Sequence, residues 1–295
     1  MELKAPSRPE PTQAVAPVIP APIDSDKLSQ YRTQHHVEHY AEFTSVDVYK
    51  NLLAYARERG LKVFILGNGS NTLFKRRNVK SLVLKNRLPK EIRDLGDGRY
   101  YISASEQISS VLKLCRTNSY DSFYYLASVP AMIGGALAMN AGRGKEHNKT
   151  IFDFVESVEY FDGDKIITLP KDQIKLEYRS TMFTGVQEKL ILGATFKFPK
   201  VQLESDPILD RVLWAKDKQD PNGGNCGSVF KQYHTGILSR LRGLKIRGAE
   251  FSGKTTNWIN NTSEKTWPIF ALIRVAKIAH FLLGKKAKLE LIEVD

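Results

Sequence analysis

The sequence contains very little cysteine. Among its 295 residues only Cys115 and Cys226 are cysteines, and two thiols cannot build a disulfide scaffold. Their separation matches none of the spacings that hold structural zinc. Cys115 continues a helical pattern of apolar residues, so we expect it on a core face with a structural role. The shortage of cysteine favours a reducing, cytoplasmic setting.

The sequence also lacks a long uncharged apolar run. Its longest apolar region, residues 267–283, is interrupted by Arg274, Lys277 and His280. It is too short and too charged to span a bilayer. The first residues show no charged start followed by an apolar stretch, so no secretory signal is expected. These absences exclude an integral membrane protein and predict no membrane insertion.

The balance of apolar and charged residues is ordinary, but the sign of the charge is not. Hydrophobic residues make up 42% and charged residues 26%, which excludes wholesale disorder, and the length suggests two or three domains. The net charge is +12, and residues 231–288 hold 12 Lys or Arg against two Glu. Such a basic region attracts a nucleic acid, an anionic lipid surface or a phosphorylated small molecule. A solvated surface that keeps the protein soluble explains it equally well.

The chain begins with a segment dense in proline. Six of the 13 prolines lie within residues 1–26, so we expect residues 1–27 to form a disordered tail. A second polar segment, residues 201–225, contains two prolines and two glycines. We expect a domain boundary inside it.

Local signals predict regular structure after the tail. Thr44 or Ser45 can cap a helix with one apolar face, and Gly60 is placed to end it. A buried strand is expected at residues 62–66. Between the tail and this helix, His35 and His39 have the i, i+4 spacing of a metal-binding pair. A polar surface run is the preferred interpretation, because no further ligand cluster is evident.

Two glycine-rich segments carry the clearest motifs. The first, Gly67-Asn68-Gly69-Ser70-Asn71, follows the expected strand, where glycines let backbone N–H groups converge on an anion. Thr72 stands where a Rossmann fingerprint needs a third glycine, so this is not that motif. The second, residues 128–142, is almost wholly small or apolar, and it suits backbone packing along a flat ligand. Taken alone, each segment is explained as well by a plain turn or a tight helix contact.

Together and in this order, the two segments resemble those of the UDP-N-acetylenolpyruvoylglucosamine reductase family. The family reads Leu-Gly-x-Gly-Ser-Asn at the first and Pro-Gly-x-x-Gly-Gly-x-x-x-Met-Asn-x-Gly at the second. The matching residues are Leu66, Gly67, Gly69, Ser70, Asn71, Pro130, Gly134, Gly135, Met139, Asn140 and Gly142, with Ala131 in place of a glycine. Further matches are Tyr178-Arg179-Ser180, Gly227-Ser228-Val229-Phe230-Lys231 and Asn257-Trp258-Ile259-Asn260. The resemblance runs from Leu28 to the C terminus and is to the compact branch, which lacks an extra substrate loop.

The resemblance implies an α+β protein. It implies a two-subdomain FAD-binding fold of the vanillyl-alcohol-oxidase/PCMH type, with residues 28–95 and 96–200 as the two subdomains. A C-terminal α+β substrate-binding domain would occupy residues 201–295. The implied cofactor-binding residues are Leu66, Gly67, Asn68, Gly69, Ser70, Asn71, Ser128, Pro130, Gly134, Gly135, Asn140 and Gly142.

The resemblance also implies an activity. The expected enzyme is a cytoplasmic monomer with non-covalent FAD and with NADPH as reductant. It would reduce the nucleotide sugar UDP-N-acetylglucosamine enolpyruvate in peptidoglycan precursor synthesis, and so serve cell-wall biogenesis, cell shape and cell division. Neither a resident metal nor a nucleic-acid partner is expected.

Reduction of an enolpyruvyl double bond needs a hydride at one carbon, a proton at the other and stabilisation of an enolate. By resemblance, Arg179 stabilises the carboxylate side, Ser228 donates the proton and a C-terminal glutamate helps to polarise the enolate. Glu290 is the preferred match for that glutamate, and Glu293 is the alternative. On one expected strand, 289–294, their opposite parity lets only one face the site. Three further residues are expected to bind substrate: Tyr178, Lys231 and Asn257.

Departures from the family pattern leave two other hypotheses open. Thr255 stands where the family commonly has a histidine, and Ala131 replaces a glycine. The chain could therefore be an FAD-dependent oxidoreductase for a different nucleotide sugar. It could also be a non-catalytic basic binding module on the same fold, although it lacks the interleaved aromatic and basic residues of single-strand binders.

Overall fold

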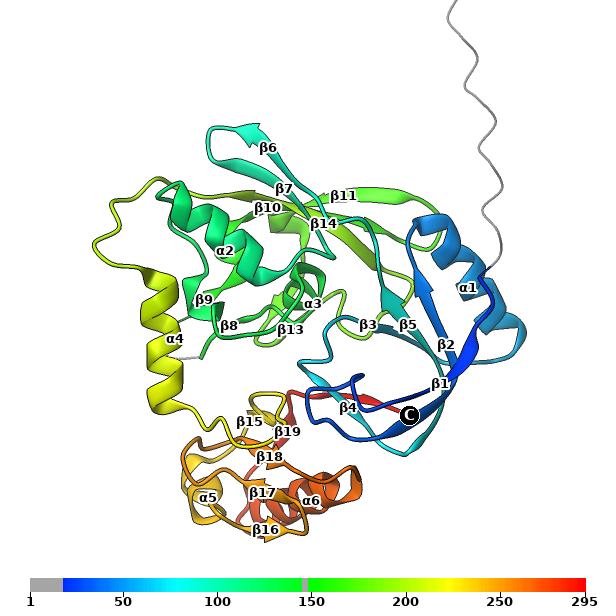
Figure 1. The fold of residues 1–295 in the computed structure, drawn as a ribbon, viewed down its shortest axis with the longest axis vertical. Helices are drawn as coiled ribbons and strands as arrows, with labels where there is room; N and C mark the ends of the chain where they lie inside the picture. Colours follow the sequence, from blue (N-terminus) through cyan, green and yellow to red (C-terminus); the bar gives the residue numbers. More distant parts are fainter. Residues whose placement is uncertain (1–17, 145–147) are drawn as a thin grey trace, which may run out of the picture.

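The protein is described by a computed structural model over residues 18–144 and 148–295. Two sheet-based units lie side by side, and a smaller C-terminal unit lies below them (Figure 1). The three units meet at the centre of the molecule, where the glycine-rich segments also lie. The arrangement therefore places those segments at a junction rather than on an outer surface.

The first unit is a four-stranded sheet with one crossover helix, α1 (Val46–Glu58). The strand order is β1 (Ala21–Ser25), β2 (His35–Phe43), β5 (Asn78–Asn86) and β3 (Val63–Leu66). β2, β5 and β3 run parallel, and β1 is antiparallel to β2. The side chain of Ser45 accepts a hydrogen bond from Val48 N, and Gly60 follows the helix with φ +62°. The predicted helix, its cap and its end are confirmed.

The expected tail is wrong at its C-terminal end. Residues 1–17 lie outside the described residues, but Ala21–Ser25 form β1 and pair with β2. Pro22 is tolerated because β1 is an edge strand, where one row of N–H groups has no strand to bond. Ile23, directly after this proline, packs against an apolar cluster that includes Val37. The density of proline indicated disorder here, but the packing of Ile23 stabilises an ordered strand.

The interpretation of residues 34–42 as a polar surface run is also wrong in part. His35 is fully buried at the start of β2, and its ring centre lies 4.6 Å from that of Phe74, in the apolar cluster that also contains Val37. One ring nitrogen of His35 lies 2.7 Å from Thr33 Oγ1 and the other lies 2.9 Å from Arg76 O. Burial lowers the pKa of His35. Both nitrogens are therefore used inside the fold, and His35 is a core residue.

The second unit is an antiparallel five-stranded sheet covered by α2 (Ile108–Thr117) and α3 (Ile133–Ala138). The strand order is β11 (Ile166–Pro170), β10 (Val155–Phe161), β14 (Leu190–Lys197), β7 (Arg99–Ser103) and β6 (Ile92–Gly96). Short elements connect them: η1 (Tyr124–Leu126), β8 (Gly142–Arg143), β9 (Lys149–Thr150), η3 (Ile151–Phe154), η4 (Lys171–Gln173), β12 (Leu176–Glu177) and β13 (Ser180–Thr181). Cys115 is fully buried on α2, which confirms its predicted position in the core.

The C-terminal unit packs three small strands against the long helix α6 (Trp267–Leu282). Its elements are β15 (Phe230–Gln232), α5 (Thr235–Arg240), β16 (Lys245–Ile246), β17 (Ala249–Phe251), β18 (Ile259–Asn261) and β19 (Lys288–Leu289). Along the described ranges 18–144 and 148–295, no helix is long and apolar enough to cross a membrane.

Two segments that were expected in the substrate domain pack elsewhere. The polar segment 201–225 contains a helix, α4 (Pro207–Lys218), which packs on the second unit: Arg116 pairs with Asp206 at 2.5 Å. The last strand, β20 (Ile292–Val294), pairs in parallel with β4 (Thr72–Phe74) of the first unit. Figure 1 shows the chain end beside β4. The expected domain boundary at residue 201 therefore does not follow the packing. α4 packs on the second unit, and β20 pairs with the free edge of β4.

Candidate active site

A cavity of about 500 Å³ lies where the three units meet. This volume is in the range of small-molecule and cofactor sites. The loop between β3 and β4, the start of α3, α4, and the segments before β15 and β20 all contribute to its lining. Both glycine-rich segments therefore open into one space, although they are far apart in the sequence.

The first glycine segment forms a wall made of backbone. Its carbonyl groups point away from the cavity: Gly69 O accepts from Gln30 N at 3.0 Å, and Lys85 Nζ donates to Gly67 O. Gly69 has φ +67°, and a Cβ there would lie 2.3 Å from Leu28 O, so only glycine fits. Within the described part of the chain, the N–H groups of residues 68–71 have no acceptor. They form a cradle of free donors along the cavity, which is suited to an anion.

The second glycine segment lines the same cavity through α3. A Cβ at Gly134 would lie 2.9 Å from Ala104 Cβ, so this glycine lets α3 approach β7. A Cβ at Gly135 would meet nothing within 4 Å, and this residue lines the cavity. Gly134 thus serves packing, while Gly135 keeps cavity space open.

The residues present fit an FAD molecule. The donors of residues 68–71 suit its diphosphate, and the open face at Gly135 suits a flat ring. Tyr125 also lines the cavity, and its buried hydroxyl has no partner among the described residues. A buried hydroxyl without a partner is costly unless a ligand completes it.

Four of the predicted cofactor residues do not line the cavity. Leu66 lies in the core of the first unit, and Val129 and Ala131 line the cavity where Ser128 and Pro130 were expected to do so. Asn140 is buried, and its Nδ2 donates to Glu177 O at 2.9 Å. The amide therefore supports the wall from behind rather than touching the cavity.

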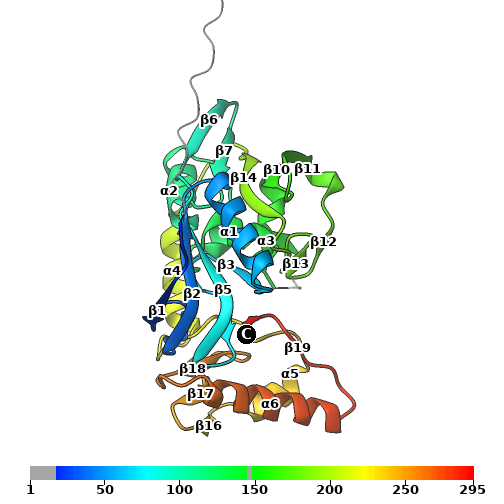
Figure 2. The same ribbon diagram turned by 90° about the vertical axis from the view of Figure 1, so that its right-hand side faces the viewer.

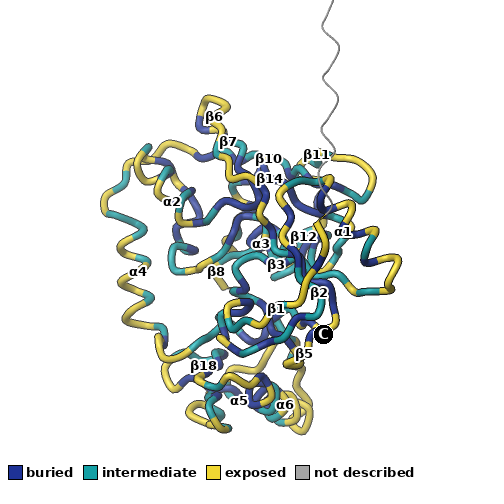
Figure 3. The backbone as a smooth tube through the Cα atoms, turned by 45° about the vertical axis from the view of Figure 1, so that its right-hand side comes forward, coloured by how far each residue is buried: buried dark blue, intermediate teal, exposed yellow. Residues whose placement is uncertain are grey.

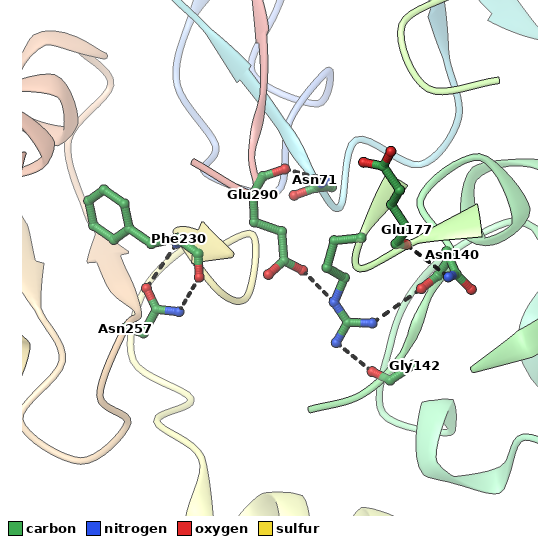
Figure 4. Close-up of polar contacts among 8 residues, drawn as sticks. Asn71, Asn140, Gly142, Glu177, Phe230, Asn257 and Glu290 are labelled. Atoms are coloured by element: carbon green, nitrogen blue, oxygen red, sulfur yellow. Dashed lines mark hydrogen bonds and ion pairs between the residues drawn. The ribbon is translucent and has the colours of Figure 1, made fainter. Parts of the chain in front are cut away.

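Arg179 and Glu290 both line the cavity and form an ion pair, and Figure 4 shows Glu290 with the polar contacts around it. Arg179 Nε lies 3.0 Å from Glu290 Oε1, and the two side chains are only 14% and 15% exposed. The Nε–H itself has no hydrogen-bond acceptor in the described ranges, so charge rather than a directed hydrogen bond holds the pair. Arg179 Nη2 donates to Gly142 O at 2.6 Å and Nη1 to Asn140 O at 3.4 Å. A guanidinium has five N–H donors, so these bonds fix Arg179 and leave donors for a ligand.

Glu290 lies where the C-terminal glutamate was expected, but the backbone that places it there differs from the one predicted. The predicted strand 289–294 is two strands, β19 and β20, and Glu290 lies in the bend between them. Its backbone N–H donates to Val229 O at 2.9 Å, and Asn71 Nδ2 donates to Glu290 O at 3.1 Å. Burial raises the pKa of Glu290, and the charges of Arg179 and Lys231 offset this only in part. Glu293 is exposed on β20, so of these two glutamates only Glu290 lines the cavity.

Ser228 lines the cavity from the segment before β15. It forms an isolated bridge with Trp258 on the neighbouring segment. In the described chain its hydroxyl has no hydrogen-bond partner, so it is free to act on a ligand. The nearby thiol of Cys226 is buried, and burial raises its pKa to about 11. Cys226 is therefore a neutral packing residue.

Asn257, which was expected to bind substrate, does not line the cavity. It is buried, with φ +72°. Its Oδ1 accepts from Phe230 N and its Nδ2 donates to Phe230 O, both at 2.9 Å (Figure 4). Both ends of the amide are therefore occupied by the backbone of β15. Asn257 holds the segment that carries Ser228.

The other two expected substrate residues lie beside the cavity rather than in its wall. Lys231 is on β15 and acts on Glu290 through its charge. Tyr178 is 37% exposed, and the Arg179 guanidinium lies 5.1 Å from the centre of its ring. Both lie near enough to Glu290 to interact with its charge.

The sequence analysis did not predict three residues of the cavity lining, of which two are arginines. Arg143, Arg211 and Trp214 line it. Arg211 lies 4.1 Å from the Trp214 ring centre and donates to Tyr125 O at 3.0 Å. Arg211 and Trp214 belong to α4, whose start was marked by an N-cap aspartate followed by proline at Asp206-Pro207. That signal was available, but the polar composition of the segment concealed the helix.

Comparison with known proteins agrees with the geometry. The profile of an FAD binding domain matches residues 37–168. UDP-N-acetylenolpyruvoylglucosamine reductase of Trichormus variabilis is 31% identical over 262 residues, which cover 84% of this chain and 77% of that protein. The protein of the same name from Aquifex aeolicus is 28% identical over 269 residues, which cover 86% and 88%.

A solved structure of a protein with the same name has a similar fold. The crystal structure of UDP-N-acetylenolpyruvylglucosamine reductase from Thermus caldophilus matches with a TM-score of 0.74 and 19% identity, over 94% of this chain and 100% of that one. The α+β fold class and the FAD cofactor expected from the sequence are confirmed. This chain belongs to the UDP-N-acetylenolpyruvoylglucosamine reductase family.

Proposed function

We propose that this chain reduces UDP-N-acetylglucosamine enolpyruvate to UDP-N-acetylmuramate in the cytoplasm, with NADPH as the reductant. The observation that carries the proposal is the Arg179–Glu290 pair, which lies in one cavity with the glycine wall and Ser228. The names of the relatives support the choice of substrate. We also propose that the protein acts as a monomer.

Each wall has a separate task in the proposed reaction. The N–H groups of residues 68–71 and the open face at Gly135 would hold FAD, which when bound supplies the hydride. Arg179 would grip the substrate carboxylate and stabilise the negative charge of the enolate. Glu290 would orient Arg179. Arg143 and Arg211 would attract the diphosphate of the nucleotide sugar.

The proton would come from the Ser228 hydroxyl. Reduction of the double bond adds a hydride to one carbon and a proton to the carbon next to the carboxylate, so NADPH and one proton are consumed for each product. The Ser228 O–H bond breaks as the C–H bond forms, and solvent returns the proton. Because Ser228 Oγ has no protein partner in the described ranges, no internal hydrogen bond has to be broken first.

The visible spectrum of the purified protein tests the proposal. A flavin band that bleaches with NADPH under anaerobic conditions and returns with UDP-N-acetylglucosamine enolpyruvate would support both half-reactions; NADH serves as the control for the reductant. Bleaching without return would reject this substrate and favour a different nucleotide sugar. If no band appeared even after incubation with FAD, the flavoenzyme would be rejected in favour of a binding module.

A further inference from the structure

Helix α6 is apolar on nearly every side, yet only one side is covered. Residues such as Ile269, Leu272 and Ile273 are buried in the C-terminal core. On the open side four large apolar residues, which we call the α6 tip, face solvent. They are Ile278, Phe281, Leu282 and Leu283, exposed by 51%, 80%, 75% and 62%. A contiguous apolar surface of this kind on a water-exposed helix indicates a binding partner.

The surroundings of the α6 tip carry charge of one sign. Residues 265–289 contain six Lys or Arg and no Asp or Glu. Arg274, Lys277, Lys285, Lys286 and Lys288 are all exposed, and none of them forms an ion pair with any described residue. An apolar tip ringed by unpaired cations is complementary to a surface that is anionic outside and apolar just beneath.

The α6 tip lies at an outer corner of the molecule and is held in place. Figure 2 shows the C-terminal end of α6 at an outer corner of the molecule, and the tube in Figure 3 is exposed there. Gly284, with φ +64°, ends the helix, and Lys285 N donates to His280 O at 2.8 Å. This is the closing bond of a Schellman motif. His280 is buried and accepts from His234 N at 2.9 Å, which anchors the helix end to the start of α5.

We propose that the α6 tip docks this protein on the surface of an anionic lipid bilayer. Phe281, Leu282 and Leu283 enter the boundary between head groups and acyl chains, and the lysines bind the lipid phosphates. A nucleic acid would use the cations but would gain little from exposed leucines. Apolar side chains that project from this protein are less suited to binding a folded protein partner than an apolar groove on its surface would be. The tip residues do not line the catalytic cavity, so docking is independent of the proposed reaction.

Vesicle co-sedimentation of the full chain tests this docking. We expect binding to vesicles of phosphatidylcholine mixed with phosphatidylglycerol, and about tenfold weaker binding to phosphatidylcholine alone. Phe281→Ser with Leu282→Ser should weaken binding about tenfold and leave its salt dependence unchanged. Lys285→Glu with Lys286→Glu should weaken it about tenfold and flatten the salt dependence.

Two matched variants control for the loss of apolar area and for the change of charge. Leu209→Ser with Leu213→Ser removes two exposed apolar residues from α4 (53% and 54% exposed, against 80% and 75% for Phe281 and Leu282). Lys90→Glu with Lys113→Glu makes the same change of charge on exposed lysines of the second unit. Both should bind vesicles as the unchanged protein does. Circular dichroism should show all four variants folded, since every changed residue is exposed.

Three results would overturn the proposal. The first is no binding to the anionic vesicles at low salt. The second is full binding by the Phe281, Leu282 variant with loss of binding when a nucleic acid competes, which would assign the basic surface to nucleic acid. The third is a concentration-dependent dimer in sedimentation velocity that this variant abolishes while vesicle binding remains, which would assign the tip to a second copy of the chain.

Discussion

The two walls of the cavity are built in opposite ways. We call residues 67–71 with Gly134 and Gly135 the glycine wall. Its glycines have no Cβ atoms that would clash, and its N–H groups have no partners that would compete with a ligand. The other wall, formed by Arg179, Ser228 and Glu290, works through side chains from three distant segments. Backbone hydrogen bonds, such as Glu290 N to Val229 O at 2.9 Å, bring these segments together. In the proposed function, the first wall would bind the cofactor and the second would carry out the chemistry on the substrate.

The largest expected effect is on the side-chain wall. Arg179→Met should lower kcat for the sugar about 10²–10³-fold, because a fixed donor for the developing charge is lost. Bleaching of the flavin by NADPH should continue at nearly its normal rate. Arg179→Lys should recover only part of the loss, because an ammonium cannot reproduce the planar fork. If Arg179→Met lost FAD instead, the two walls would not be separate.

The glycine wall predicts a contrast between two substitutions to alanine. Gly69→Ala should destabilise the fold by about 2–4 kcal/mol, since it combines a positive φ with a clash against Leu28 O. Gly135→Ala should leave the apoprotein as stable or up to about 1 kcal/mol more stable, because alanine favours helix. Its FAD affinity should nevertheless fall, because the new Cβ enters the cavity. Urea unfolding and FAD titration of the apoproteins measure both; equal FAD affinity in Gly135→Ala would contradict the assignment.

Asn257 provides a test between a supporting role and a ligand-binding role. Asn257→Ala leaves the backbone N–H and C=O of Phe230 without partners and should cost about 1–3 kcal/mol of unfolding free energy. The KM for the sugar should change little in the folded protein. A large rise in KM at unchanged stability would restore Asn257 as a substrate-binding residue.

The smallest expected effect concerns the dependence of stability on pH. Burial raises the pKa of Glu290 above its ordinary 4.5, so between the two values the folded state holds more protons than the unfolded state. The contribution of Glu290 to stability is therefore fully present below 4.5 and is lost as pH rises through the raised value. Urea unfolding at about pH 4 and about pH 8 should show this loss, and Glu290→Gln should reduce it. An unchanged difference would exclude Glu290 as its source.

The parts of the molecule that were correctly predicted depend on local signals. Ser45, Gly60 and the apolar face of α1 act within one helix, and the glycine requirement at Gly69 belongs to a single loop. Such features need no knowledge of the rest of the fold. The same holds for Cys115, whose burial follows from the helical pattern around it.

The parts that were not predicted depend on contacts across the chain. The strand β1 is stable because β2 offers an edge, and His35 is buried because its ring nitrogens find Thr33 and Arg76. The resemblance assigned Asn257 to substrate binding, whereas the structure shows its amide bonded to the backbone of Phe230. Glu290 lines the cavity and Glu293 does not, although the parity argument assumed a continuous strand that the structure divides in two.

The central claim is that one wall holds FAD while the other completes reduction of the sugar, and Ser228→Ala tests it most directly. The two half-reactions are measured separately by stopped-flow absorbance on the FAD-loaded variant. The account predicts a normal FAD content, a normal rate of bleaching by NADPH, and reoxidation by UDP-N-acetylglucosamine enolpyruvate slowed about 10²–10⁴-fold. Reoxidation at the rate of the unchanged protein would contradict it.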